Sequence, residues 1–202
     1  MIIYNILHVF FWLLFSIFFR AEAIGRENMP KDGGVILAAN HMSNFDPPLL
    51  ATYLRRPVSY MAKKELFEVP VLKQIITACF SFPVRRGAAD RGAIKAALNE
   101  LKKGRCVGLF PEGTRSRDGK THKAEAGVAL IAAMAKVPVV PAAIIGTNRI
   151  FANGSLLPKL KIIYGEPMYF TGKHNNKEEL DEFSKKIMEE IKKMINLHSN
   201  NG

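Results

Sequence analysis

A histidine and an aspartate lie five residues apart in the short polar stretch NHMSNFDPP, which follows an apolar run. An imidazole and a carboxylate on so short a stretch suggest acid–base chemistry by His41 and Asp46. A structural explanation is equally simple, because an aspartate directly before Pro47 is typical of a helix start, with the side chain as N-cap. The spacing alone leaves both interpretations open, and one carboxylate can serve both roles.

A second polar stretch, PEGTRSRDG, combines residues that suit a phosphorylated ligand. Gly113 permits a close backbone approach or a turn, and Thr114 and Ser116 can donate hydroxyl hydrogen bonds. Arg115 can bind a phosphate through two parallel hydrogen bonds. Glu112 would repel a phosphate and is better suited to a substrate hydroxyl or to fixing an arginine. A solvated surface turn is the competing interpretation.

The remaining reactive residue types give weaker signals. Arg85 and Arg86 follow the apolar run FSFPV and mark either a solvated strand end or part of the same site. Cys79 and Cys106 lie within apolar segments, which is typical of buried, reduced thiols in a cytoplasmic protein. The sequence contains no G-x-S-x-G nucleophile elbow and no P-loop, and its histidines lack metal-ligand spacing. We therefore expect neither a serine acyl-enzyme nor a metal site.

The polar stretches are separated by segments that alternate between strand and helix. Strands are expected at 35–39, 58–62, 80–84, 106–110, 137–145 and 161–165. Helices are expected at 49–54, 71–79, 89–104, 123–136 and 177–196. This alternation predicts an α/β sheet layered by helices, and the prolines of 137–145 favour an edge or irregular strand. Polar residues follow three of the strands, and strand ends are where such sheets bind ligands.

The bulk composition fits one domain with an anionic partner. The chain has 202 residues, 48% of them hydrophobic, and a formal net charge of +11. Such a charge suits nucleic acid, an anionic membrane surface or a phosphate-bearing substrate. Nucleic acid is the least supported of the three, because the sequence has no zinc-finger spacing, no RNP-like strand and no basic recognition helix.

Residues 1–19 contain no Lys, Arg, Asp or Glu. As one helix they would be about 28 Å long, close to the thickness of a bilayer core. A cleaved signal peptide is the alternative, but no basic region precedes the apolar run and the run is long for that class. We expect a retained membrane-anchoring helix at 1–22, spanning or interfacial, followed by a catalytic domain at 23–202. Arg20 and the downstream basic excess predict that this domain is cytoplasmic.

Four stretches of the sequence resemble, in order, the four sequence blocks of the glycerophospholipid acyltransferases. These stretches are NHMSNFD, FPVRRG, FPEGTRS and VPVVPAAI. The bacterial 1-acyl-sn-glycerol-3-phosphate acyltransferase branch is the most similar. The resemblance runs from about Gly34 to Gly165. It implies a single α/β domain with a central mixed, largely parallel sheet flanked by helices, preceded by an apolar membrane helix.

The resemblance also implies roles for the site residues. His41 would be the general base for a glycerol hydroxyl that attacks an acyl thioester directly, and Asp46 would orient the imidazole. Arg115 and either Arg85 or Arg86 would bind the acceptor's phosphate, and Glu112 its glycerol part. The other residues of these blocks expected at the substrate are Asn40, Gly113, Thr114 and Ser116.

The expected activity is transfer of a fatty acyl group from acyl-CoA or acyl-carrier protein to the sn-2 hydroxyl of lysophosphatidic acid, giving phosphatidic acid. The expected partners are that lipid, the anionic membrane surface and the acyl donor, with no resident cofactor, metal or nucleic acid. The cell membrane is the expected location. Two alternatives stay open: an acyltransferase for glycerol 3-phosphate or another lysolipid, and a catalytically idle lipid-binding membrane protein.

Overall fold

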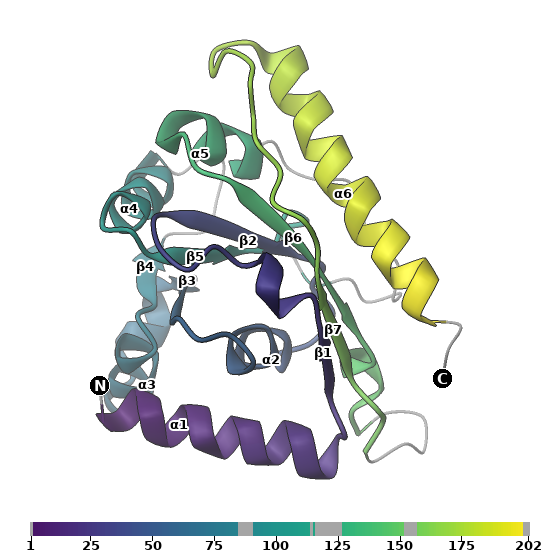
Figure 1. Ribbon diagram of the computed structural model, residues 1–202. Helices are drawn as coiled ribbons and strands as arrows, with labels where there is room; N and C mark the ends of the chain where they lie inside the picture. The colour runs from purple at the N-terminus through teal and green to yellow at the C-terminus, as the bar shows by residue number, and fades with distance from the viewer. Residues whose placement is uncertain (1, 85–90, 114, 116–126, 152–156, 200–202) are drawn as a thin grey trace.

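A seven-stranded sheet forms the centre of the computed structural model, which describes residues 2–84, 91–113, 115, 127–151 and 157–199 (Figure 1). In spatial order the strands are β1 (Glu22–Ile24), β7 (Lys161–Tyr164), β6 (Val139–Ile145), β2 (Val35–Ala39), β5 (Cys106–Leu109), β3 (Val58–Lys63) and β4 (Phe82–Val84). All neighbours pair in parallel except β6 and β7, which are antiparallel. The prediction of a mixed, largely parallel sheet in a single α/β domain is therefore confirmed.

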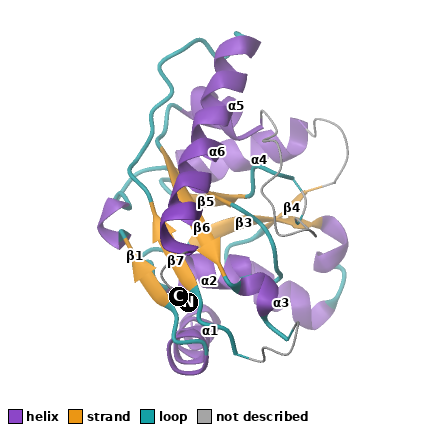
Figure 2. Cartoon of the chain, turned by 90° about the vertical axis from the view of Figure 1, so that its right-hand side faces the viewer, coloured by secondary structure: helices purple, strands orange, loops and turns teal. Residues whose placement is uncertain are grey.

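Helices cover both faces of this sheet (Figures 1 and 2). The helices are α1 (Ile2–Leu13), α2 (Asp46–Thr52), α3 (Pro70–Ala78), α4 (Arg91–Lys102), α5 (Gly127–Ala135) and α6 (Lys177–Ser199). One hydrophobic core, here the α2-side core, lies between the sheet and α1 and α2. The other, the α6-side core, lies between the sheet and α4, α5 and α6.

The buried strand β2 shows how the sequence divides between these two cores. Val35, Leu37 and Ala39 belong to the α2-side core, whereas Ile36 and Ala38 belong to the α6-side core. All five side chains are fully buried, as expected for a central parallel strand. Since successive side chains alternate, the residues that follow β2 also face opposite sides of the sheet. The carboxyl ends of β2, β3, β4, β5 and β6 share one edge, here called the C-terminal edge.

The strand and helix predictions within the described ranges are confirmed, apart from their bounds and three details. The first detail is the strand expected at 80–84, which begins only at Phe82. Phe80 has a φ of 57°, and its N–H donates to Thr77 O at the end of α3. A left-handed residue of this kind ends a helix, so Phe80 belongs to the turn and not to the strand.

The second detail is β6, whose prolines favoured an edge or irregular strand. The edge position is wrong, because β6 lies between β7 and β2. Pro141 faces the β7 side, where its carbonyl accepts a hydrogen bond from Gly165 N at 2.8 Å. Gly165 lies just past the end of β7. Pro141, which has no N–H, therefore stands at a position where the β6–β7 ladder has already ended.

The third detail is the N-terminal segment. A single helix over residues 1–19 is not present: α1 ends at Leu13, a π-helical turn covers Leu14–Phe18, and Arg20 has a φ of 46°. In the described part of the chain, no helix combines the length and apolar character needed to cross a membrane. Phe15 and Phe19 are instead fully buried in the α2-side core, which explains why the helix does not continue straight.

Candidate active site

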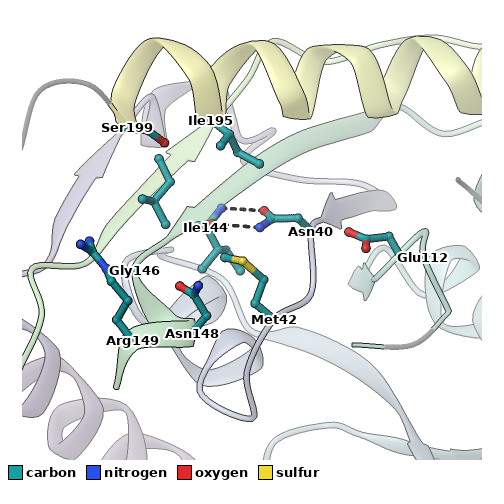
Figure 3. A pocket seen from close by; sticks show the side chains of 10 residues that line it. Asn40, Met42, Glu112, Ile144, Gly146, Asn148, Arg149, Ile195 and Ser199 are labelled. Atoms are coloured by element: carbon teal, nitrogen blue, oxygen red, sulfur yellow. Dashed lines mark hydrogen bonds between the residues drawn. The ribbon is translucent and has the colours of Figure 1, made fainter. Parts of the chain in front are cut away.

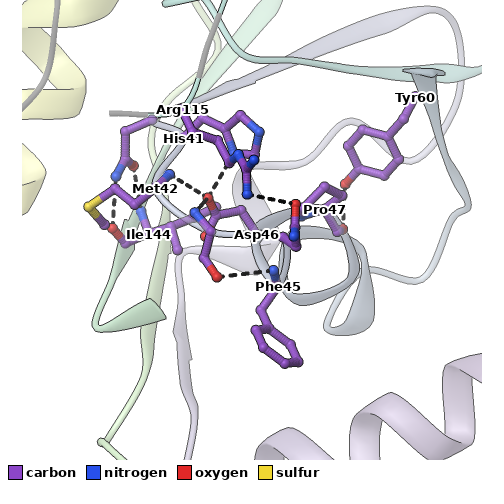
Figure 4. Close-up of polar contacts among 11 residues, drawn as sticks. His41, Met42, Phe45, Asp46, Pro47, Tyr60, Arg115 and Ile144 are labelled. Atoms are coloured by element: carbon purple, nitrogen blue, oxygen red, sulfur yellow. Dashed lines mark hydrogen bonds and ion pairs between the residues drawn. The ribbon is translucent and has the colours of Figure 1, made fainter. Parts of the chain in front are cut away.

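His41 and Asp46 meet at the C-terminal edge, directly after β2 (Figure 4). His41 Nδ1 lies 2.8 Å from Asp46 Oδ2, and the Asp46 side chain is completely buried while that of His41 is 14% exposed. A carboxylate only accepts hydrogen bonds, so Nδ1 carries the proton in the neutral ring and Nε2 keeps its lone pair. The imidazole is therefore held in the tautomer that a general base needs.

The Asp46 carboxylate also fixes the loop that carries His41. Besides the imidazole, Oδ2 accepts the backbone N–H groups of Met42 at 2.6 Å and Ser43 at 2.7 Å. The prediction that Asp46 would be an N-cap is wrong, because Asp46 is the first residue of α2 and Phe45 is the N-cap, without a side-chain cap. The next two residues are prolines, which have no N–H to cap, so the carboxylate is available to the loop.

An aromatic stack supports the imidazole from its other side. The Phe110 ring lies 4.0 Å from the His41 ring at an interplanar angle of 19°, and the Tyr60 ring lies 6.2 Å from Phe110 at 11°. Tyr60 donates its hydroxyl hydrogen bond to Pro47 O at 2.8 Å. Burial raises the pKa of Tyr60 well above its ordinary value, which keeps it a donor. The stack opposes rotation of the imidazole about its Cβ–Cγ bond, because that rotation would push the ring edge into Phe110.

Gly108 makes room for this stack. A Cβ at that position would lie 2.2 Å from Tyr60 Cε1 and 2.9 Å from Val58 Cγ1, so no larger residue fits without moving the ring. Since β3 and β5 pair in parallel with Tyr60 opposite Gly108, the register of the two strands sets the stack. Sequence reasoning missed Tyr60, Phe110 and Gly108. The one available signal was a glycine in an otherwise apolar strand.

Asn40, the residue before His41, ties the end of β2 to β6 (Figure 3). Its Nδ2 donates to Ile144 O at 2.9 Å, and its Oδ1 accepts from Ile144 N at 2.8 Å. The β2–β6 ladder ends at Ala39 and Ala142, so the carboxamide replaces the next backbone pair. The Asn40 amide thereby positions β6 against the His41 loop. Its expected contact with substrate stays a prediction.

The stretch after β5 reaches the same edge. Glu112 is buried, and Gly113 closes the turn with a φ of 67° and an N–H that donates to Phe110 O at 3.0 Å. Arg115 Nη1 donates to Asn44 Oδ1 at 3.0 Å, so the exposed guanidinium lies at the His41 loop. The structure therefore brings Glu112, Gly113 and Arg115 to the loop that carries His41 and Asp46.

Four of the expected site residues lie outside the described residues: Arg85, Arg86, Thr114 and Ser116. Two basic residues that sequence reasoning did not assign lie at the C-terminal edge instead. Lys63 ends β3 and Lys64 follows it, both with exposed side chains. Arg115, Lys63 and Lys64 place three cationic side chains on the β3–β5 side of His41, with the exposed Glu65 directly after them.

The two cysteines do not suit covalent catalysis. Burial raises the pKa of the Cys106 thiol to about 12 and also raises that of Cys79, so both thiols stay protonated near neutral pH. Among the described residues, no three side chains of His, Cys, Asp or Glu gather in a way that could hold a metal ion. The chemistry available is that of a base, a carboxylate that orients it, and nearby cations.

A pocket of about 250 Å³ opens at the C-terminal edge on the α6 side (Figure 3). Its lining comes from the residues around β2, the end of β6, the 3₁₀ turn Thr147–Arg149 and the end of α6. Polar and charged lining residues include Asn40, Glu112, Asn148 and Arg149. Sequence reasoning did not single out Asn148 or Arg149, because the segment after β6 has the composition of an ordinary turn.

Comparison with known proteins is consistent across sequence and structure. The sequence model of the Acyltransferase family matches residues 20–145. A 1-acyl-sn-glycerol-3-phosphate acyltransferase of Bacillus subtilis (strain 168) is 36% identical over 152 residues, which cover 73% of each chain. One from Streptococcus pneumoniae is 37% identical over 133 residues, covering 64% of this chain and 48% of that protein.

The fold is similar to that of a solved enzyme. The crystal structure of the 1-acyl-sn-glycerophosphate (LPA) acyltransferase PlsC from Thermotoga maritima superposes with a TM-score of 0.76 and 29% sequence identity. The match covers 95% of this chain and 79% of the Thermotoga chain, so it includes the sheet, both helical layers and the C-terminal edge.

Proposed function

Because this chain belongs to the Acyltransferase family, we propose that it transfers a fatty acyl group to the sn-2 hydroxyl of lysophosphatidic acid and so makes phosphatidic acid. The relatives named for 1-acyl-sn-glycerol-3-phosphate acylation support this substrate. The observation that carries the proposal is the contact of His41 with buried Asp46 at 2.8 Å, at the edge of the sheet where ligands bind.

In the proposed reaction His41 Nε2 takes the proton of the acceptor hydroxyl as the oxygen attacks the thioester carbonyl. The new carbon–oxygen bond forms, the carbon–sulfur bond breaks, and the departing thiolate receives the proton from the imidazolium. Asp46 stabilises the imidazolium in between. No residue of the protein becomes acylated, and no resident cofactor or metal is needed. General-base catalysis of this kind contributes roughly 10²- to 10⁴-fold.

The acceptor's phosphate is proposed to bind on the β3–β5 side of His41. Arg115 supports this placement, since its guanidinium contacts the His41 loop through Asn44. Lys63 and Lys64 add positive charge at the same edge. Arg85 or Arg86 is expected to contribute as well, and Glu112 to orient the glycerol part.

The N-terminal segment is proposed to attach the enzyme to the membrane surface that holds this lipid. Its outward face is apolar and exposed over residues Ile2, Ile3, Ile6, Val9, Phe10, Trp12, Leu13, Ile17 and Phe18. An apolar patch of this size on a helix suits insertion into the headgroup region, with the basic surface attracted to anionic lipid. The proposed location is the cytoplasmic side of the cell membrane, where acyl-CoA or acyl-carrier protein supplies the acyl group.

Membrane attachment has a direct test, because Trp12 is the only tryptophan of the chain. Its fluorescence should shift to the blue when vesicles of anionic phospholipid are added. Phe10→Ser should weaken vesicle binding. Tyr169→Ser is the control: it removes an aromatic side chain that is at least as exposed, from the loop before α6, and should leave vesicle binding unchanged. Equal binding by all three proteins would contradict an insertion through α1.

The reaction is tested by incubating the purified protein with lysophosphatidic acid and palmitoyl-CoA or palmitoyl-carrier protein, and measuring free thiol and phosphatidic acid. We expect turnover with wild type and a loss of at least a hundredfold with His41→Ala. Glycerol 3-phosphate and other lysolipids serve as competing acceptors. If one of them is acylated faster, that compound and not lysophosphatidic acid is the acceptor. If no acceptor is acylated, the protein is a lipid-binding protein without catalysis.

A further inference from the structure

The pocket beside Asn40 lies on the opposite side of His41 from the basic residues described above. His41 follows β2, and the sheet continues on one side to β5 and β3 and on the other to β6 and β7. Arg115, Lys63 and Lys64 belong to the β5–β3 side. The pocket belongs to the β6 side, since Ile144, Asn148 and Arg149 line it. The two sides could therefore hold the two substrates of a transfer reaction.

The pocket also faces away from the apolar N-terminal segment. In β2 the side chains alternate, so His41 points toward α2, and Asn40 toward α6. Ile195 and Ser199 of α6 complete the lining. Helix α1, whose exposed side chains are largely apolar, lies on the other side of the sheet, as the ribbon shows (Figure 1). A ligand that enters through this pocket therefore comes from the aqueous side and not from the bilayer.

The lining of the pocket is polar at one end and cationic at the other. Figure 3 shows Glu112 and Arg149 at opposite ends, with Asn40 and Met42 between them. Arg149 is exposed, and its guanidinium has no hydrogen-bond or ion-pair partner among the described residues; its Nη2 lies 3.6 Å from the place of a Cβ on Gly146. Asn148 offers a carboxamide that can both donate and accept.

We propose that this pocket binds the 4′-phosphopantetheine arm of the acyl donor. The inference rests on the proposed acyl transfer and adds the place of the donor. Acyl-CoA and acyl-carrier protein share this arm, which carries a thioester at one end, two amides along its length and a phosphate at the other end. With the thioester near His41, the arm runs past Met42, one amide pairs with Asn148, and the phosphate reaches Arg149. The guanidinium suits phosphate oxygens through two parallel hydrogen bonds.

The phosphate contact is tested by pairing enzyme variants with truncated donors. Palmitoyl-4′-phosphopantetheine and palmitoyl-pantetheine differ only in the phosphate. Wild type should have a KM about tenfold lower for the phosphorylated donor, and Arg149→Ala should abolish that preference by raising this KM alone. The KM for lysophosphatidic acid should not change. Arg149→Lys should restore part of the preference.

Two further variants separate this role from a structural one. Arg55→Ala removes an exposed arginine at the start of β3, at the opposite edge of the sheet, and should leave every KM unchanged. Asn148→Ala should raise the KM of both thioesters equally, because both carry the amides. An Arg149→Ala protein with a raised KM only for lysophosphatidic acid would assign the pocket to the acceptor. An equal loss with both donors, or no loss, would also overturn the proposal.

Direct binding keeps this proposal independent of the acceptor. Calorimetry with 4′-phosphopantetheine and with pantetheine measures the phosphate contact without turnover. Tighter binding of the phosphorylated compound by wild type, lost in Arg149→Ala, supports the donor site even if lysophosphatidic acid proves not to be the acceptor. If transfer to lysophosphatidic acid occurs but the phosphate makes no difference to binding, the proposed function stands and the donor site is refuted.

Discussion

Asp46→Asn is the substitution that most directly examines how the carboxylate serves catalysis. Asp46 Oδ2 accepts three hydrogen bonds, from His41 Nδ1, Met42 N and Ser43 N. An asparagine oxygen at the same place keeps the acceptor but loses its charge, which weakens each bond by about 1 kcal/mol and the three together by about 3 kcal/mol. The asparagine NH₂ would occupy the place of Oδ1, which is buried and has no hydrogen-bond partner among the described residues.

The catalytic loss should exceed this loss of stability. Without the carboxylate the imidazolium that forms in the reaction has no opposite charge beside it, so kcat should fall by about 10²- to 10⁴-fold. The melting temperature should fall by about 6 to 12 °C, as expected for about 3 kcal/mol in a chain of this size. Calorimetry and thiol release at 20 °C separate the two effects, and Asp32→Asn on an exposed turn is the matched control. More than a tenth of wild-type kcat in the folded Asn variant would refute the orienting role of Asp46.

Gly108→Ala should displace Tyr60 and destabilise the protein by about 1 to 3 kcal/mol in denaturant unfolding. It should also lower kcat with little change in either KM. An unchanged kcat would show that the aromatic stack does not position His41. Arg115→Ala should raise the KM for lysophosphatidic acid about tenfold or more, and Arg115→Lys should raise it less. A matching rise in the KM for the acyl donor would contradict a contact between Arg115 and the acceptor's phosphate. Because burial raises the pKa of Cys106 to about 12, its thiol should stay protonated at pH 8 and react with a thiol reagent only after unfolding; rapid labelling of the native protein would contradict its burial.

Much of the fold followed from the sequence because its strands are fully buried. Continuous apolar runs such as VILAA and CVGL predict central parallel strands, and both are central. The short strand Glu22–Ile24 was missed, since three residues that begin with glutamate carry no strand pattern and are held only by pairing with β7. The position of Pro141 depended on where β7 ends, which no local pattern reveals.

The candidate site was predictable where the residues are close in sequence. Asp46 lies five residues after His41, and one turn is enough to bring them together. Phe110, Tyr60 and Gly108 are brought to His41 by the pairing of β3, β5 and β2, so their contribution depends on strand register. Asn148 and Arg149 reach the site only because β6 lies beside β2, and no local sequence pattern reveals which strands are neighbours.

The short strand β1 also determines when the N-terminal segment can fold during synthesis. Glu22 N donates to Leu160 O, and Leu160 N donates to Phe19 O. The whole of β1 pairs with β7. At 5–20 residues per second, roughly seven to thirty seconds separate the emergence of these partners from the ribosome. Phe15 and Phe19 therefore stay without their final packing for that time, along with the rest of an apolar segment. Nascent chains are thus free to meet a bilayer or a chaperone before the sheet closes over their first residues.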